Sequence, residues 1–395
     1  MKNNMAKILF GIFIIALFLR LSTVFNQKDI DKVPRGDASA YDQIALNLAS
    51  GNGFSQVKDG SMTPVVYRTP GYPMFLAGIY YIFGHHYIIA RIIQAILGAL
   101  YCIITFLISN IIYDDPKIGL VASLCTAFYK PFISGFHYYG GPALMYSESF
   151  FMFIVGLAIL ALLYFIKKGD IKSGMLAGFL MGLALLTRPE FAIFPVLLVI
   201  YLLYVSHLSI KRVLRKYFIL YLFTILTMSP WVARNYIVYK EFIPLSSIGG
   251  YAFSRGNNSL ANGAMSSTSF SWEDEDIQKN KEYFRMGIEY LKNNPKRIPS
   301  LFIKKILVHW APFEDGFKRF NSFYAFILFF GSIGILFFRK KIILENILLL
   351  ILLSTTLAAV ITYGEPRYRY PYELYLIMFS ALTFSKMIKR MRCGL

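Results

Sequence analysis

Several arginines, each close to aromatic residues, stand at the ends of apolar stretches in this sequence. A guanidinium group presents two parallel donors to phosphate oxygens and stays charged at any physiological pH. A single arginine in such a place often only reaches toward lipid headgroups, but the repetition favours a shared site for a phosphate carried by a lipid. The predicted binding residues are Arg68 in VYRTPGYP, Arg188 in LTRPEF, Arg234 in SPWVARNY, Arg367, Tyr368 and Arg369 in YGEPRYRYP, and Tyr41 in the first polar loop.

Two acids add a second kind of chemistry at these ends. Asp37 opens the amphipathic stretch GDASAYDQIALNLASGNG, residues 36–53, and Glu148 lies in MYSES. A carboxylate beside a bound phosphate can take the proton of an attacking hydroxyl, as sugar transfer from a polyprenyl phosphate requires, because that sugar carries its own leaving group. We therefore predict that Asp37 acts as the general base. The structural alternatives are a helix cap for Asp37 and a favourable helix N-terminal position for Glu148.

The composition indicates a membrane protein. Of the 395 residues, 56% are hydrophobic and 16% charged, which is too apolar for a soluble domain. The chain has 41 Lys and Arg against 22 Asp and Glu. With Met1 placed in the cytoplasm, the loops on that side hold 17 basic residues and three acids, which follows the positive-inside pattern. Topology therefore explains the excess charge, both termini are predicted to be cytoplasmic, and no nucleic-acid partner is needed.

The apolar stretches predict an all-α polytopic membrane protein with about ten transmembrane helices, each crossing needing about 20 apolar residues. The candidate spans are residues 8–25, 87–112, 118–137, 147–166, 173–187, 190–206, 216–232, 320–338, 342–362 and 371–389.

Two longer segments between the spans are predicted to lie at the outer face. The first outer loop, residues 26–86, contains both residues 36–53 and an apolar stretch, residues 69–84, that is too short to cross and is expected to lie at the interface. The second, residues 233–319, is predicted to hold a helix over about 273–293 and an interfacial helix from Pro295. The chain thus divides into an N-terminal membrane region at 1–232, this outer segment, and C-terminal helices at 320–395.

Other kinds of site find little support in the sequence. No glycine-rich nucleotide-binding signature is present, and the five histidines show no zinc-ligand spacing. The three cysteines offer no disulfide in an outer loop. No cofactor is therefore certain.

The motifs, taken in order along the chain, resemble those of a known group of enzymes. They are GDxxxY followed by AxxLxxGxGF over residues 36–54, RTPGYPxFLA over 68–77, LTRPE, SPWxxRNY and PRYRYP. Together they resemble the GT-C superfamily of polyprenyl-phosphate-sugar-dependent glycosyltransferases, which includes the protein O-mannosyltransferases and the lipid A aminoarabinose transferases.

The resemblance implies a glycosyltransferase of the plasma (inner) membrane with its active site on the outer face and an inverting reaction. It places the catalytic base on Asp37, and at Glu148 it implies a second catalytic residue that either holds a metal or positions the acceptor. The donor would be a polyprenyl-phosphate sugar and the acceptor a glycan, a lipid or a protein. Ala38 follows Asp37 where many relatives have a second acid, so metal dependence stays open.

A transporter or flippase of lipid-linked sugars is the alternative. Such a protein would also need basic and aromatic residues around a membrane cavity, but it usually shows inverted repeats and charges near the middle of its spans. Here the charged residues gather at the outer ends, which favours the enzyme.

Overall fold

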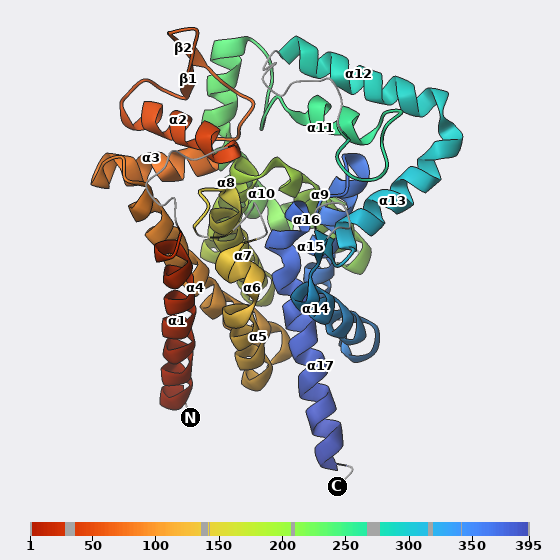
Figure 1. Cartoon of the computed structure of the whole chain (residues 1–395). Coiled ribbons are helices and arrows are strands. Elements are labelled where there is room, and N and C mark those ends of the chain that lie inside the picture. Colours follow the sequence, from red (N-terminus) through yellow and green to blue (C-terminus); the bar gives the residue numbers. More distant parts are fainter. Residues whose placement is uncertain are drawn as a thin grey trace.

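The protein is a helical bundle with a cap of short elements at one end (Figure 1). The computed structural model describes residues 2–27, 36–135, 141, 143–206, 210–266, 277–314, 319–340 and 342–393. Within this part of the chain, five helices are long and apolar enough to cross a membrane. They belong to α1 (Lys2–Phe25), α4 (Tyr87–Tyr113), α7 (Ser147–Lys168), α10 (Ile210–Tyr239) and α15 (Ile343–Ile361). The all-α, multi-span membrane architecture is confirmed.

The remaining predicted spans fall on shorter helices: α5 (Pro116–Phe128), α8 (Ile171–Thr187), α9 (Ile193–Ser206) after the 3-10 turn η1 (Pro189–Ala192), α14 (Ser322–Ile333) continued by the π-helical η3 (Gly334–Phe338), and α17 (Glu373–Cys393). The count of ten crossings stays a prediction. α1 begins and α17 ends at the same end of the bundle (Figure 1).

The segment predicted as one span over residues 118–137 is not a continuous helix. α5 ends at Phe128, Tyr129 is extended, and a short helix α6 (Lys130–Ser134) follows, while residues 136–137 lie outside the described part of the chain. Pro131 fits this break, because proline has no amide hydrogen with which to continue the helix of α5 but is tolerated in the first turn of a new helix such as α6.

Close packing of α8 on α10 fixes where α8 ends. Gly174, Gly178 and Gly182 recur every four residues on α8, and a methyl group at Gly182 would come within 2.6 Å of Thr227 Cβ. Small residues at this spacing let two membrane helices approach closely. The C-terminus of α8, which precedes Arg188, is therefore held firmly against the bundle.

The first outer loop folds into α2 (Asp37–Ala49), a hairpin of β1 (Ser55–Lys58) and β2 (Ser61–Pro64), and α3 (Gly71–Phe83). α3 has 13 residues and lies across the bundle in Figure 1, as the interfacial prediction requires. At about 1.5 Å per residue it is shorter than the hydrocarbon core of a membrane.

The second outer segment supplies the rest of the cap (Figure 1). It contains α11 (Gly249–Gly256), α12 (Ile277–Asn293), η2 (Pro295–Arg297), α13 (Ile298–Trp310), β3 (Phe313–Glu314) and β4 (Arg319–Phe320). α12 lies within the helix predicted over 273–293, of which residues 273–276 are outside the described part. α16 (Pro366–Arg369) and the 3-10 turn η4 (Tyr370–Tyr372) connect α15 to α17 beneath this cap.

Candidate functional site

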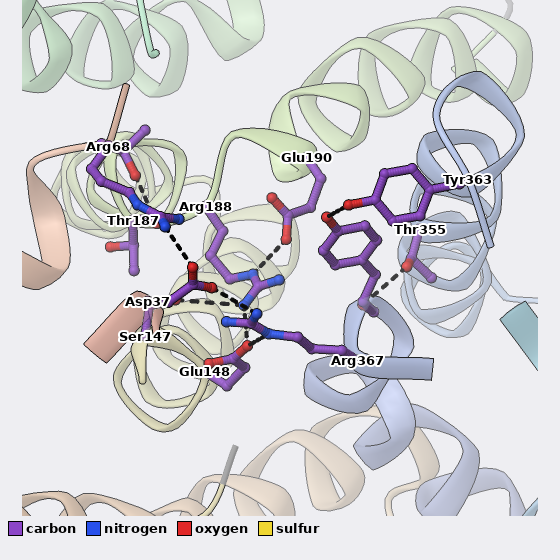
Figure 2. A network of polar contacts seen from close by, with 12 residues as sticks. Asp37, Arg68, Ser147, Glu148, Thr187, Arg188, Glu190, Thr355, Tyr363 and Arg367 are labelled. Atoms are coloured by element: carbon purple, nitrogen blue, oxygen red, sulfur yellow. Dashed lines mark hydrogen bonds and ion pairs between the residues drawn. The ribbon is translucent and has the colours of Figure 1, made fainter. Parts of the chain in front are cut away.

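A chain of alternating arginines and acids connects the first outer loop with residues from other parts of the sequence (Figure 2). Asp37 stands between two guanidinium groups: its Oδ1 is 2.5 Å from Nη2 of Arg68, and its Oδ2 is 2.7 Å from Nη1 of Arg367. Arg367 also donates through Nε to Oε1 of Glu148. The same Glu148 oxygen is 2.8 Å from Nη1 of Arg188, whose Nε donates to Glu190. Three arginines and three acids from distant parts of the sequence thus form one network.

The N-terminus of α2 presents Asp37 to this network. Gly36 is the residue that precedes the helix, with φ of 60° and ψ of −134°, a conformation that favours glycine. Asp37 is the first helical residue, and no side-chain hydrogen bond caps the helix. The capping alternative is therefore wrong, since the carboxylate is used by Arg68 and Arg367 instead.

Arg68 is positioned by the RTPGYP motif. The Thr69 hydroxyl donates to the carbonyl of Thr187 over 2.9 Å, and Gly71 lies so close to α8 that an added methyl group would be 2.8 Å from the carbonyl oxygen of Leu186. The motif therefore anchors the first outer loop on the end of α8, one residue before Arg188.

Glu148 lies in the first turn of α7 and its side chain is completely buried. Its Oε1 takes both guanidinium contacts, while its Oε2 has no hydrogen-bond partner within the described residues. A buried carboxylate needs such partners, because the cost of removing a lone charge from water is several kcal/mol. Glu148 thus holds Arg188 and Arg367 close together.

The network faces a cavity of about 140 Å³. Its polar wall includes Asp37, Arg68, Arg188, Glu190 and Arg367. The other polar side chains that line it are Tyr41, Tyr67, Thr69, Ser147, Thr187, Ser246, Tyr251, Tyr363 and Tyr368.

Tyrosines surround the guanidinium groups. The Arg68 guanidinium carbon lies 5.2 Å from the centre of the Tyr41 ring, and that of Arg188 lies 5.7 Å from the Tyr368 ring. The hydroxyl of Tyr368 is 2.7 Å from that of Tyr363. Aromatic faces attract cations at such distances, so these rings help to hold the arginines in place.

The charges of the arginines dominate the ionisation of Asp37. Burial by itself raises the pKa of this carboxyl, but the charges and hydrogen bonds of Arg68 and Arg367 outweigh burial and lower the pKa to about 2. Asp37 is therefore ionised at neutral pH and, in this arrangement, a weak base.

Two of the predicted binding residues do not line the cavity. Arg234 donates to the carbonyl oxygens of Val65 over 2.9 Å and of Phe54 over 2.8 Å, and so ties α10 to the first outer loop. Arg369 is fully buried, 2.9 Å from Glu373 and 2.7 Å from a carbonyl of α13. Residues two apart on a helical turn do not share a face, which explains why Arg369 points away from the side that Arg367 presents.

The described acids do not form a metal site. No group of three His, Cys, Asp or Glu side chains within the described residues is arranged to hold a metal ion. The carboxylates of Asp37 and Glu148 already accept hydrogen bonds from guanidinium groups. A divalent cation would have to compete with these guanidinium groups for the same carboxylates, so this arrangement does not fit a divalent metal at Glu148.

Several residues of the site had no assigned role in the sequence analysis. Glu190 stands two residues after Arg188, within LTRPEF, and this spacing could have pointed to it. Tyr363 lies four residues before Arg367, but Ser246 and Tyr251 come from the second outer segment, where no motif marks them. Only the folded arrangement brings these residues to the cavity.

Comparisons with known proteins agree with this architecture. A family model described as dolichyl-phosphate-mannose-protein mannosyltransferase matches residues 67–233. A comparison with curated protein sequences found no match.

Solved structures share the fold at low sequence identity. The apo oligosaccharyltransferase of Archaeoglobus fulgidus is similar with a TM-score of 0.63 and 13% identity, over 98% of this chain and 51% of that one. The oligosaccharyltransferase AglB of the same organism, in complex with an inhibitory peptide and a dolichol-phosphate, gives a TM-score of 0.62 and 13% identity, over 100% and 51%. ArnT from Cupriavidus metallidurans bound to undecaprenyl phosphate gives 0.56 and 12%, over 95% and 59%.

The present chain thus spans about half the length of the oligosaccharyltransferase. At these identities the likeness concerns the fold. The shared fold and the matched family model confirm the resemblance of this membrane protein to the GT-C superfamily.

Proposed function

We propose that the protein is a membrane glycosyltransferase that moves a sugar from a polyprenyl-phosphate donor to an acceptor hydroxyl. The observation that carries this proposal is the position of Asp37, 2.5 Å from Arg68 and 2.7 Å from Arg367 at the wall of one cavity. A base and the groups that hold a leaving phosphate must stand next to each other for such a reaction.

The reaction is a single displacement at the anomeric carbon. An oxygen of the acceptor hydroxyl forms the new glycosidic bond, its proton passes to Asp37, and the bond from the anomeric carbon to the phosphate oxygen breaks. The electron pair of that bond leaves with the phosphate. Arg68 and Arg367 stabilise the growing negative charge through charge-assisted hydrogen bonds, with Arg188 as the next cation along the network. Attack opposite to the leaving group inverts the configuration of the sugar.

The relatives support a lipid-phosphate donor. One similar structure contains a dolichol-phosphate and another undecaprenyl phosphate, and the matched family is described by a dolichyl-phosphate sugar. The acceptor is a glycan, a lipid or a protein. The positive-inside pattern of the loops supports a cavity at the outer face of the plasma membrane, with both termini in the cytoplasm.

Transfer by purified protein in detergent tests the proposal. A polyprenyl-phosphate donor with a radiolabelled sugar is incubated with candidate acceptors of each class, and Asp37→Asn is compared with the wild type. We expect the wild type to label one acceptor class and the variant to be inactive while it remains folded. The matched control is Glu282→Gln, which neutralises an exposed acid on α12 outside the cavity and should transfer at the wild-type rate.

This assay also separates the enzyme from a flippase of lipid-linked sugars. A flippase moves its substrate between two faces of a membrane and has no covalent product in detergent. Absence of transfer to every acceptor class, together with movement of the labelled lipid across reconstituted vesicles, would support the flippase instead.

A further inference from the structure

The charges around the cavity balance. Three guanidinium groups face three carboxylates, and each is ion-paired within the network: Asp37, Arg68, Glu148, Arg188, Glu190 and Arg367. A donor phosphate would add negative charge next to carboxylates in a poorly solvated cavity, and like charges at short distance repel strongly there. The phosphate therefore binds these arginines more favourably if one carboxylate gives up its place.

Burial distinguishes the three carboxylates. The Glu148 side chain is completely buried and shares one oxygen between two arginines. Glu190 is 18% exposed and pairs only with Arg188 among the ion pairs of the described residues. Asp37 is the most exposed of the three, at 28%, and lines the cavity.

The shape of the Asp37 contact matches that of a phosphate. Its two oxygens reach two different guanidinium groups, at 2.5 Å on Arg68 and 2.7 Å on Arg367. Two non-bridging phosphate oxygens can make the same pair of contacts, since guanidinium groups bind carboxylate and phosphate oxygens alike. Asp37 thus occupies the position that suits the donor phosphate.

We infer that the donor phosphate displaces Asp37 from Arg68 and Arg367, and that this exchange releases Asp37 to act as the base. The inference rests on the proposed function. Glu148 keeps Arg367 and Arg188 in position throughout, as a positioning residue, because its buried carboxylate remains bound to both.

The exchange couples base strength to donor binding. The two arginines lower the pKa of Asp37 to about 2 while they are paired with it. When a phosphate takes the arginines, Asp37 loses those contacts and gains a negative neighbour, and both changes raise the pKa of its carboxyl. The acceptor hydroxyl is then activated only beside a bound donor, so the donor binds before the acceptor reacts.

Equilibrium binding of undecaprenyl phosphate tests the exchange. The purified full chain in detergent is titrated with this lipid, and binding is followed by native mass spectrometry. Asp37→Asn and Asp37→Ser remove the competing charge, so both should bind the lipid phosphate more tightly, by at least about fivefold, a typical coupling between two sites. Asp37→Glu keeps a competing carboxylate, so its affinity for the lipid phosphate should differ from that of the wild type by less than about fivefold. The control Glu282→Gln should bind like the wild type.

The outcomes separate this inference from the proposed function. Arg367→Ala should weaken binding of the lipid phosphate whether or not Asp37 competes. If it does, while folded Asp37→Asn and Asp37→Ser bind no more tightly than the wild type, the exchange is wrong and the phosphate site stands. If Arg68→Ala and Arg367→Ala both leave binding unchanged, the phosphate site itself is wrong. Size-exclusion profiles and melting temperatures show which variants are folded, and the two neutral substitutions ensure that one failure to fold does not end the test.

Discussion

Replacement of Arg367 by alanine should slow sugar transfer without unfolding the protein. The network shows why folding is retained, because each acid that Arg367 contacts has a second arginine partner: Asp37 keeps Arg68, and Glu148 keeps Arg188. Neither carboxylate is left without a cation. Loss of a donor that stabilises transition-state charge typically costs about 3 to 4 kcal/mol, or about a hundredfold to a thousandfold in rate.

Lysine at position 367 should restore only part of the rate. Arg367 uses Nε for Glu148 and Nη1 for Asp37, so its planar fork serves two acids at once. A lysine keeps the charge but has a single nitrogen and cannot present two parallel donors. The order of rates should therefore be wild type, then Arg367→Lys, then Arg367→Ala.

Arg369→Ala is the informative comparison, because this arginine stands two residues away in the same motif. Its side chain and that of its partner Glu373 are completely buried. Removal of one partner of a buried ion pair typically costs about 3 to 5 kcal/mol of stability. We therefore expect a lower melting temperature for Arg369→Ala, and a defect in rate mainly for Arg367→Ala.

The assay measures initial rates of transfer from a radiolabelled polyprenyl-phosphate sugar in detergent, together with melting temperatures. An Arg367→Ala protein that is folded and transfers at the wild-type rate would refute the role of Arg367 in stabilising the leaving phosphate. Equal loss of melting temperature in both variants would refute the assignment of different roles to the two arginines.

Three further predictions follow from the same contacts. Glu148→Gln removes the buried charge that holds Arg188 and Arg367 together, so it should lower the melting temperature. It should also reduce kcat more than it weakens binding of the lipid phosphate, and a wild-type kcat would contradict this role. The folded protein lowers the pKa of Asp37 from 3.8 to about 2, so the pairing of Asp37 should add about 2 kcal/mol of stability above pH 3.8. This stability is lost as the pH falls from 3.8 through 2. The difference in melting temperature between wild type and Asp37→Asn should therefore be smaller at pH 3 than at pH 6, and a constant difference would contradict the pairing. Arg234→Ala should free the carbonyls that it binds and speed hydrogen exchange in residues 54–65, and unchanged exchange would contradict its anchoring role.

The sequence predicted the convergence of the site for a physical reason. Apolar spans of similar length end at the same two membrane surfaces, so polar residues at their outer ends meet in one layer even when they are far apart in the chain. Asp37 and Arg367 are 330 residues apart and in direct contact. A shared site for the acids and arginines at these ends was expected on this basis, and in the structure Asp37 contacts both Arg68 and Arg367.

The orientation of side chains within that layer could not be predicted from the sequence. Arg367 and Arg369 have similar neighbours in PRYRYP, and only the packing of α13 and α17 around Arg369 decides that it is buried. The capping alternative for Asp37 is wrong for a related reason, since local rules contain no information about arginines that lie on other segments of the chain. The break after α5 could have been predicted, because Pro131 follows Phe128 closely and lacks the amide hydrogen that a continuous helix needs.

The carboxylates of the network stabilise an arginine cluster at the edge of a membrane. Three arginines close together at the ends of spans would repel one another and lose hydration, so a fold that needs them to bind a phosphate must supply counter-charges while the site is unliganded. Glu148 supplies one from a buried helix turn, where its carboxylate contacts two cations at once and cannot leave without losing both contacts. Asp37 supplies another from the first turn of α2, at the cavity wall and partly exposed, where a stronger anion can replace it. The same two carboxylates that make the arginine cluster stable therefore differ in how easily they are displaced, and this difference suits Glu148 to hold the site and Asp37 to react in it.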